Sequence, residues 1–186
     1  MRYAPHHKEE IREKLIESSC AIAKKGGFST TGVDALMSAI GLTGGAFYSH
    51  FGSKGELFAA LIEREMAHSA HMLAGTVDAS SEQISSCLRS YLSSEHALHP
   101  ENGCVLPALG AEIARAGPQV RAAVERALRK LQRRWSERLE GDDDAAWAVM
   151  AQCVGALVMA RAVESDSSRQ EILASVRRSI ERRLLP

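Results

Sequence analysis

Apolar residues recur every three or four positions along most of this chain, which is the period of amphipathic α-helices. A first stripe covers residues 8–25 and ends at a glycine pair, a common helix stop. A shorter stripe covers 33–40, and two further helices are predicted over 44–50 and 54–73. Because no alternating run of apolar and polar residues is long enough for a strand, the pattern predicts an all-α protein.

Two helix starts in this region carry capping signals. Ser53 precedes the helix at 54–73 with Glu56 three residues later, which is the spacing of a capping box. Gly32 stands at the start of the second helix, where it is a second-choice capping residue. The neighbouring Thr31 is therefore the better candidate for capping that helix or for touching a phosphate.

A polar break at residues 75–81 predicts a change of domain, and the pattern after it stays helical to the end of the chain. Helices are predicted over 82–97, 104–116, 119–140, 145–164 and 169–185. The chain therefore divides into a head at 1–53, a connecting helix at 54–74 and a helical domain at 75–186.

The last two predicted helices favour a subunit interface. Residues 145–164 are apolar nearly all round, so this helix must be covered on more than one side. Residues 169–185 carry an apolar stripe beside it. Since one subunit offers few surfaces, a two-fold homodimer through residues 145–185 is expected. The acidic triplet 142–144 is interpreted as a cap for the first of these helices rather than a metal site.

Composition is that of an ordinary soluble protein, with 45% hydrophobic and 25% charged residues and a net charge of zero. Residues 1–54 hold seven Lys or Arg and five Asp or Glu, a net charge of +2, so the remainder carries −2. A global basic excess is therefore no argument for a nucleic-acid partner, but the mild polarity suits a head that faces DNA.

Cysteine usage and the N-terminus predict a cytoplasmic protein without a metal or other cofactor. The four cysteines form no CxxC pair, which argues against a zinc site and a disulfide framework. The N-terminus is too polar for a signal peptide, and no apolar run approaches the ~18 residues of a membrane helix. There is also no nucleophile-base signature, phosphate loop or metalloprotease motif, so an enzyme is not expected.

Residues 30–54 hold the pattern with the clearest functional meaning. Two short helical segments flank the tight break at 41–43, and the second segment is rich in small residues and aromatics. This arrangement is typical of a helix-turn-helix, whose second helix enters the DNA major groove.

The same region resembles the DNA-binding head of TetR-type transcriptional regulators. The resemblance is carried by Gly27-Phe28, Thr31, Val33, Leu36, Gly41-Leu42-Thr43, Gly45, Phe47-Tyr48, His50-Phe51, Lys54 and Leu57-Phe58. It covers the first 70 residues, and residues 103–115 resemble one branch of the family more weakly. The resemblance implies about nine helices, a homodimer through the last two, and a palindromic operator. It further implies a repressor, or less commonly an activator, that a small-molecule effector in the C-terminal domain releases from DNA.

Eight residues are expected at the DNA. Phosphate contacts are assigned to Thr31, Thr43, Tyr48 and Lys54, and base reading to Gly44, Gly45, Ala46 and His50. Thr43 is also expected to cap the third helix. Gly44 departs from the commoner family pattern, which has a larger or basic residue there. Because two glycines offer no side-chain donor, specificity is expected from Ala46 or Phe47 against thymine methyls, from His50, and from the second helix or N-terminal arm.

An effector pocket is expected between the helices from residue 82 to 164, with a mostly apolar lining. Its candidate residues are Tyr91, His96, Cys104, Leu109, Glu112, Trp135, Trp147, Met150 and Cys153. Two alternatives stay open. Cys104 lies near a helix N-terminus, where a thiol can become reactive, so the protein could sense oxidants or electrophiles. The chain could instead be an architectural DNA-binding protein with weak sequence discrimination.

Overall fold

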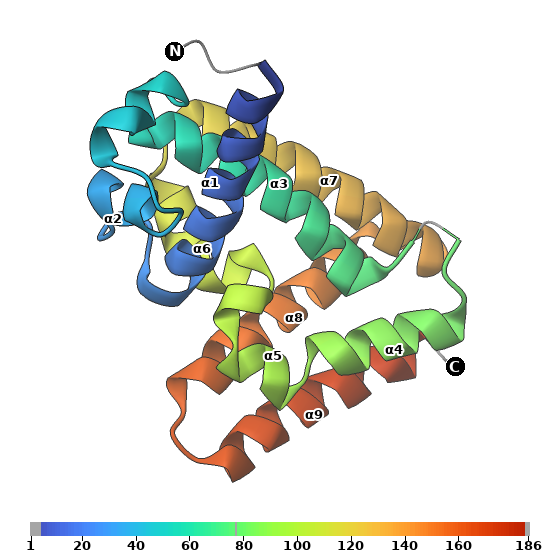
Figure 1. Ribbon diagram of the computed structural model, residues 1–186. Coiled ribbons are helices and arrows are strands. Elements are labelled where there is room, and N and C mark those ends of the chain that lie inside the picture. The colour runs from blue at the N-terminus through green and yellow to red at the C-terminus, as the bar shows by residue number, and fades with distance from the viewer. Residues whose placement is uncertain (1–4, 77, 185–186) are drawn as a thin grey trace.

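The computed structural model describes residues 5–76 and 78–184, and all regular elements within them are helices (Figure 1). The predicted all-α fold is confirmed. The α-helices are α1 (Pro5–Gly26), α2 (Val33–Ser38), α3 (Lys54–Ala74), α4 (Ser81–Tyr91), α5 (Ser94–Leu98), α6 (Val105–Arg115), α7 (Pro118–Arg138), α8 (Asp143–Ala162) and α9 (Asp166–Leu184). Two 3-10 helices, η1 (Gly44–Ser49) and η2 (Pro100–Asn102), complete the order.

The helix predicted over residues 82–97 is wrong in one respect, because the chain forms two helices there. At Leu92 the backbone leaves the helical region, with φ −94° and ψ 55°. Ser93 then caps the next helix, since its Oγ accepts a hydrogen bond from the amide of His96 at 3.2 Å. The capping hydroxyl of Ser93 therefore starts a new helix at a point where the spacing of apolar residues alone predicted one continuous helix.

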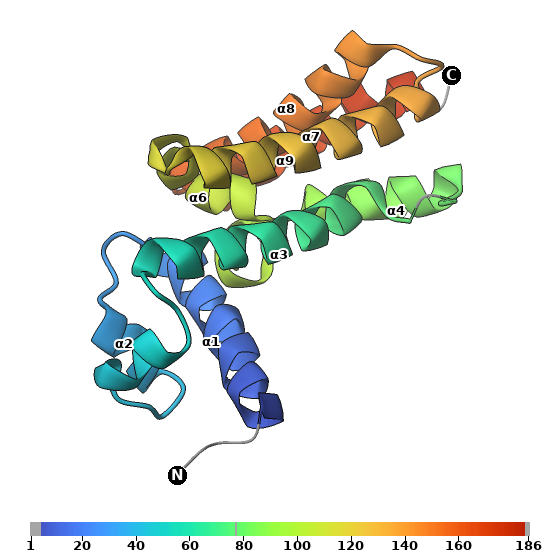
Figure 2. The ribbon, with the colours of Figure 1, turned by 90° about the horizontal axis from the view of Figure 1, so that it is seen from above.

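The head and the body, which is the part of the chain from α4 to α9, are arranged around one long helix. α1, α2 and η1 form the head at one end, and α3 runs from this head along the body (Figures 1 and 2). α7 lies beside α3, and α8 and α9 form an antiparallel pair behind α7. The helix that begins in the head is therefore also a wall of the body.

Two clusters of buried apolar residues fill the molecule. The first joins the head to α6 and the start of α7, and includes Leu15, Phe47, Phe51, Leu61, Val105, Leu109 and Val124. The second lies between α4 and the last helices, and includes Tyr91, Trp135, Met150, Leu157 and Ile180. Because the first cluster crosses from head to body, the head does not have a core of its own.

α8 is long and apolar enough to cross a membrane by length and composition, and it is the single such helix among the described residues. The expectation that no segment approaches this length is thus corrected. Its buried residues, such as Cys153 and Leu157, pack in the second cluster against neighbouring helices. Asp142 caps this helix by accepting a hydrogen bond from the amide of Ala145 at 2.8 Å, as expected for the acidic triplet.

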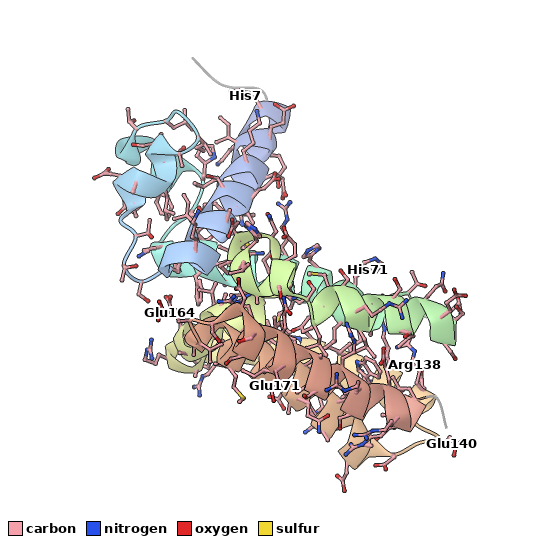
Figure 3. All side chains as sticks on the ribbon, turned by 90° about the horizontal axis from the view of Figure 1, so that it is seen from below. His7, His71, Arg138, Glu140, Glu164 and Glu171 are labelled. Carbon is pink, nitrogen blue, oxygen red and sulfur yellow. The ribbon has the colours of Figure 1, made fainter. Side chains whose placement is uncertain are left out.

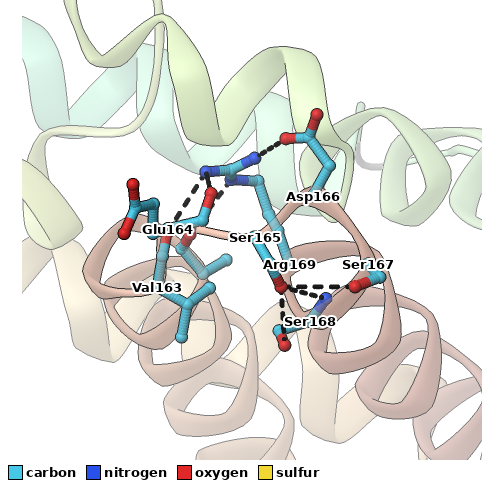
Figure 4. A network of polar contacts seen from close by, with 8 residues as sticks. Val163, Glu164, Ser165, Asp166, Ser167, Ser168 and Arg169 are labelled. Atoms are coloured by element: carbon cyan, nitrogen blue, oxygen red, sulfur yellow. Dashed lines mark hydrogen bonds and ion pairs between the residues drawn. The ribbon is translucent and has the colours of Figure 1, made fainter.

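A buried arginine fixes the turn between α8 and α9 (Figure 4). Arg169 is 7% exposed, and its guanidinium donates to the carbonyl oxygens of Ala160 at 3.2 Å and Val163 at 3.2 Å. It also donates to the carboxylate of Asp166. The last carbonyl groups of a helix have no hydrogen-bond donor within that helix. The Arg169 side chain supplies donors to carbonyl groups at the end of α8 and thereby holds α9 against α8.

A buried ion pair joins the head to the body. Lys24 Nζ of α1 lies 2.9 Å from Glu65 Oε2 of α3, and the same ammonium donates to the carbonyl oxygen of Gly103 at 2.9 Å. The two side chains are only 4% and 10% exposed. Three segments that are distant in the sequence therefore meet at one charge.

We expect Lys24→Met to lower the free energy of unfolding by about 3–5 kcal/mol, because it leaves the Glu65 carboxylate buried without its partner. Urea denaturation of the full chain measures this loss. The double variant Lys24→Met with Glu65→Met should recover most of it, and the exposed neighbour Lys25→Met should change little. Equal losses at Lys24 and Lys25 would contradict the assigned role.

Candidate nucleic-acid interface

The two helices of the helix-turn-helix meet across a short turn at Gly41. Gly41 has φ +75°, a left-handed conformation that favours glycine, and its amide donates to the carbonyl of Ser38 at 3.0 Å. The second helix of the motif, η1, is a short 3-10 helix and not an α-helix. Phe47 and Phe51 are 0% and 1% exposed and stack with ring centroids 6.0 Å apart. They belong to the core, so the contact of Phe47 with thymine methyls expected from the sequence is wrong, and both rings support η1 from inside the head.

Arg12 anchors the end of η1 to α1. Its guanidinium lies 4.0 Å from the centre of the Phe51 ring and donates to the carbonyl oxygen of His50 at 2.8 Å. Burial lowers the pKa of His50, and the nearby cations Lys8 and Arg12 act in the same direction. Its Nδ1 is buried and has no hydrogen-bond partner within the described residues. His50 is thus an uncharged side chain at neutral pH, held by its backbone.

Tyr48 is the aromatic residue that the head turns outward. Its side chain is 69% exposed and meets Phe47 edge-on, with ring centroids 5.3 Å apart. A rigid ring with a free hydroxyl on a fixed support can pack on a sugar-phosphate backbone. The phosphate contact assigned to Tyr48 stays a prediction.

Of the other three residues assigned to phosphate, Thr31 and Lys54 make side-chain hydrogen bonds within the head. Thr31 Oγ1 donates to the carbonyl of Gly27 at 2.9 Å, and Lys54 Nζ donates to the carbonyl of Ser29 at 3.1 Å. Thr43 stands at the start of η1, but its side chain makes no capping hydrogen bond. The expected caps from Thr31 and Thr43 are therefore wrong, because Gly32 and Thr43 begin their helices without a side-chain acceptor. The lysine is held at the foot of α3, on the side of the head.

The glycine pair of the base-reading segment has two different surroundings. A Cβ added to Gly44 would lie 1.7 Å from Oδ1 of Asp34, whereas one on Gly45 would meet nothing within 4 Å. Asp34 belongs to α2, and its carboxylate fills the space where other side chains would project from Gly44. Ala46, the next residue, is half-buried. Sequence reasoning missed Asp34, because only the packing of α2 on η1 brings it to Gly44.

We expect Gly44→Ala to lower the free energy of unfolding more when Asp34 is present than when Asp34 is replaced by alanine. The difference should be about 0.5–2 kcal/mol. The reason is that the new methyl group displaces the Asp34 carboxylate. Urea denaturation of the four proteins in this cycle measures the coupling. Gly45→Ala, which meets open space, should show no coupling to Asp34. A coupling of equal size at both glycines would contradict the assigned contact.

Glu112, expected in the effector pocket, lies instead where α6 meets the head. Its carboxylate accepts hydrogen bonds from the amides of Phe28 at 2.9 Å and Ser29 at 2.7 Å, and from the Ser29 hydroxyl. Burial acts to raise the pKa of Glu112, but these hydrogen bonds outweigh it and the pKa is lowered. The charged carboxylate is thus a second tie between head and body.

Most of the other effector candidates are packed in the two cores. Tyr91, His96, Cys104, Trp135, Met150 and Cys153 lie together in or against the second cluster, and Leu109 lies in the first. Trp147 is half-buried, and the guanidinium carbon of Arg129 lies 5.5 Å from the centre of its ring. Trp147 also lines a shallow hollow of about 250 Å³. The structure therefore brings six of the candidates together, as packed side chains. Within the described residues no group of three potential metal ligands is found.

His96 is held as a neutral ring by its neighbours. Its Nε2 accepts a hydrogen bond from the Cys104 amide at 2.8 Å, so Nδ1 carries the proton and donates to the carbonyl oxygen of Tyr91 at 2.7 Å. Gly103 packs on the ring, since an added Cβ would lie 2.3 Å from it. Burial, with the nearby charges of Arg161 and Lys24, lowers the pKa of His96 to about 4.

We expect the protein to lose stability as the pH falls from 6.5 to 4. The pKa of His96 is about 4 in the folded chain against an ordinary 6.5, so the unfolded chain binds more protons in this window. The stabilisation that the neutral His96 provides is fully present above pH 6.5 and amounts to roughly 3 kcal/mol of unfolding free energy. Urea denaturation across this range should show a smaller loss for His96→Asn than for wild type. The exposed His71→Asn should follow wild type, and a wild-type slope in His96→Asn would contradict this assignment.

A groove between α3 and α7 was not predicted. It has a volume of about 750 Å³ and is lined by Glu63, Met66, Ala67, Ala70, His71, Gly75, Thr76, Ala123, Arg126, Ala127, Lys130, Leu131 and Arg134. At its far end Arg138 donates to the carbonyl of Thr76 at 2.9 Å, which ties α7 to the end of α3 (Figure 3). The spacing of cations at 126, 130 and 134 was visible in the sequence, but not the helix that they face.

The head and its outward-facing η1 define a helix-turn-helix DNA-binding protein. Residues 15–61 match the family model described as bacterial regulatory proteins, tetR family. Comparison with curated proteins gives no match. These findings, with the solved structures below, confirm the resemblance to TetR-type regulators and support a DNA-binding regulator.

Solved structures of such regulators share the fold over nearly the whole chain. The reduced form of E. coli NemR is 21% identical, with a TM-score of 0.76 over 93% of this chain and 96% of that one. The regulatory protein TetR from Rhodobacter sphaeroides is 24% identical, with a TM-score of 0.74 over 92% and 97%. A TetR transcriptional regulator from Chloroflexus aurantiacus J-10-FL is 20% identical, with a TM-score of 0.77 over 94% and 96%.

Proposed function

We propose that this protein is a transcriptional repressor that binds a palindromic operator as a homodimer and is released by a small-molecule effector. The observation that carries the proposal is the outer face of η1. There the exposed ring of Tyr48 lies beside the open backbone of Gly45, on a head that Phe47 and Phe51 hold rigid. A backbone without side chains can come close to the edges of the bases in a major groove.

The homodimer is proposed to form through α8 and α9. Val158 and Met159 on α8 are 49% and 57% exposed, although the opposite side of the helix is fully packed in the second core. Exposed apolar residues on such a helix suit a self-complementary interface. Two heads in one dimer then face half-sites one helical turn apart, about 34–36 Å.

Release is proposed to act through α3, because this helix begins in the head and forms a wall of the body. An effector shifts the equilibrium only if it binds one arrangement of α3 more tightly than the other. A small change in the direction of α3 alters the separation of the two heads, and therefore their fit to successive major grooves.

Sensing through Cys104 is the less supported mechanism. The side chain is 2% exposed and packs in the second core, so a reagent must first open the body to reach it. Reactive cysteines are usually at least partly exposed. If Cys104 is the sensor, Cys104→Ser must abolish release of the operator by an oxidant or alkylating agent. Unchanged release in that variant would exclude it.

We expect a saturable complex between the full chain and DNA from its own upstream promoter, measured by fluorescence anisotropy at fixed salt. Tyr48→Ala should weaken this complex about tenfold, because it removes a backbone contact but no base contact. The loss should be the same for operator variants. Leu98→Ala removes a similarly exposed apolar side chain on α5 and should bind as wild type.

Equal affinity for promoter and scrambled DNA would instead favour the architectural alternative, which also predicts a steep salt dependence without release. The absence of binding to any DNA would overturn the proposed function. Analytical ultracentrifugation of the same protein, with and without operator DNA, measures whether it is a dimer.

A further inference from the structure

The groove between α3 and α7 combines an apolar floor with a charged rim. α3 and α7 lie side by side along the body (Figures 1 and 2). Ala67 and Ala70 of α3 and Ala127 of α7 supply accessible apolar surface to the groove, and Met66 and Leu131, each only 3% exposed, lie beneath them. Its volume of about 750 Å³ falls within the range of small-molecule sites, roughly 300–1,000 Å³.

One side of this groove carries a row of cations. Arg126, Lys130 and Arg134 follow one another at intervals of four residues, so they lie along one face of α7. None of the three makes an ion pair or side-chain hydrogen bond with the residues that the structure describes. Glu63 is the one acidic residue among the lining side chains of the groove.

The row has an electrostatic cost that a ligand could relieve. Like charges at a spacing of four residues repel one another on a helix. An anionic group at the rim would offset this repulsion, and the apolar floor beneath it excludes a ligand that is polar throughout.

We propose that this groove binds an amphipathic anion, a small molecule with an extended apolar body and one carboxylate or phosphate head. The head group would lie against the cations of α7, and the apolar body would lie on Ala67, Ala70 and Ala127. The assignment rests on the proposed function, for which it names the chemical class of the effector.

The position of the groove links its occupancy to the head. Met66, which lines the groove, follows Glu65, the residue that binds Lys24 of α1. A ligand between α3 and α7 therefore pushes on the helix that carries the buried ion pair. Since Glu65 and Met66 belong to one rigid helical turn, a displacement of α3 at the groove reaches the head.

The test is calorimetric titration of the full chain with decanoate and decyl phosphate below their micelle concentrations. Both anions should bind at least tenfold more tightly than 1-decanol, and decyltrimethylammonium should not bind. Arg126→Gln with Lys130→Gln should weaken the anions at least tenfold. Glu63→Gln should tighten them severalfold, because it removes the opposing charge.

Arg133→Gln is the matched control, since Arg133 is an exposed cation of α7 that does not line the groove. It should bind the anions as wild type. Equal binding of the anions and the alcohol, or equal losses in the groove variant and the control, would overturn the proposal. Binding to vesicles of anionic phospholipid without binding to either single-chain anion would also overturn it.

The operator assay separates this inference from the proposed function. A protein that fails to bind operator without ligand fails the proposed function, whatever the titrations give. A protein that forms the operator complex but binds neither anion fails this inference alone. Decanoate should dissolve the operator complex of wild type and not that of the Arg126→Gln, Lys130→Gln variant, and binding without release would overturn the regulatory assignment.

Discussion

The buried ion pair between Lys24 and Glu65 determines how the head is fixed to the body. A buried ammonium is tolerated only when it is paired and its remaining protons are bonded. Here the carboxylate supplies the charge, and the carbonyl of Gly103 accepts a second hydrogen bond. Gly103 in turn lies against the ring of His96, with no space for a side chain between them. One charge on α1 thus sets the positions of α3 and of the loop before α6.

The carboxylate of Glu112 also joins α6 to the head, because it accepts hydrogen bonds from the amides of Phe28 and Ser29. Because the first apolar core also crosses from head to body, a head that pivots alone would break two polar ties and open a packed core. The motion that costs less free energy keeps the head together with α3 and α6. The head can then change its orientation only together with α3 and α6.

Sequence periodicity predicted the all-α fold and most helix bounds, because each helix buries one stripe. It missed the break at Leu92, which depends on the capping hydroxyl of Ser93. It also could not separate core from cavity: Tyr91 and Trp135 have the apolar character of pocket residues, yet are 1% and 0% exposed. Periodicity shows that a residue faces inward, whereas only the packing of other helices decides whether it meets a neighbour or a space.

The face that we propose to read bases shows the same limit at the level of single residues. The sequence suggested that Gly44 and Gly45 leave this face without side chains. The structure fills the space above Gly44 with the carboxylate of Asp34, while Gly45 stays open. A carboxylate there is an acceptor that repels phosphates, so it cannot add to general affinity for DNA. In the proposed complex, the attraction is therefore expected from the backbone amides of η1, the ring of Tyr48 and the net charge of +2 on residues 1–54, and Asp34 is expected to act as a local repulsive group.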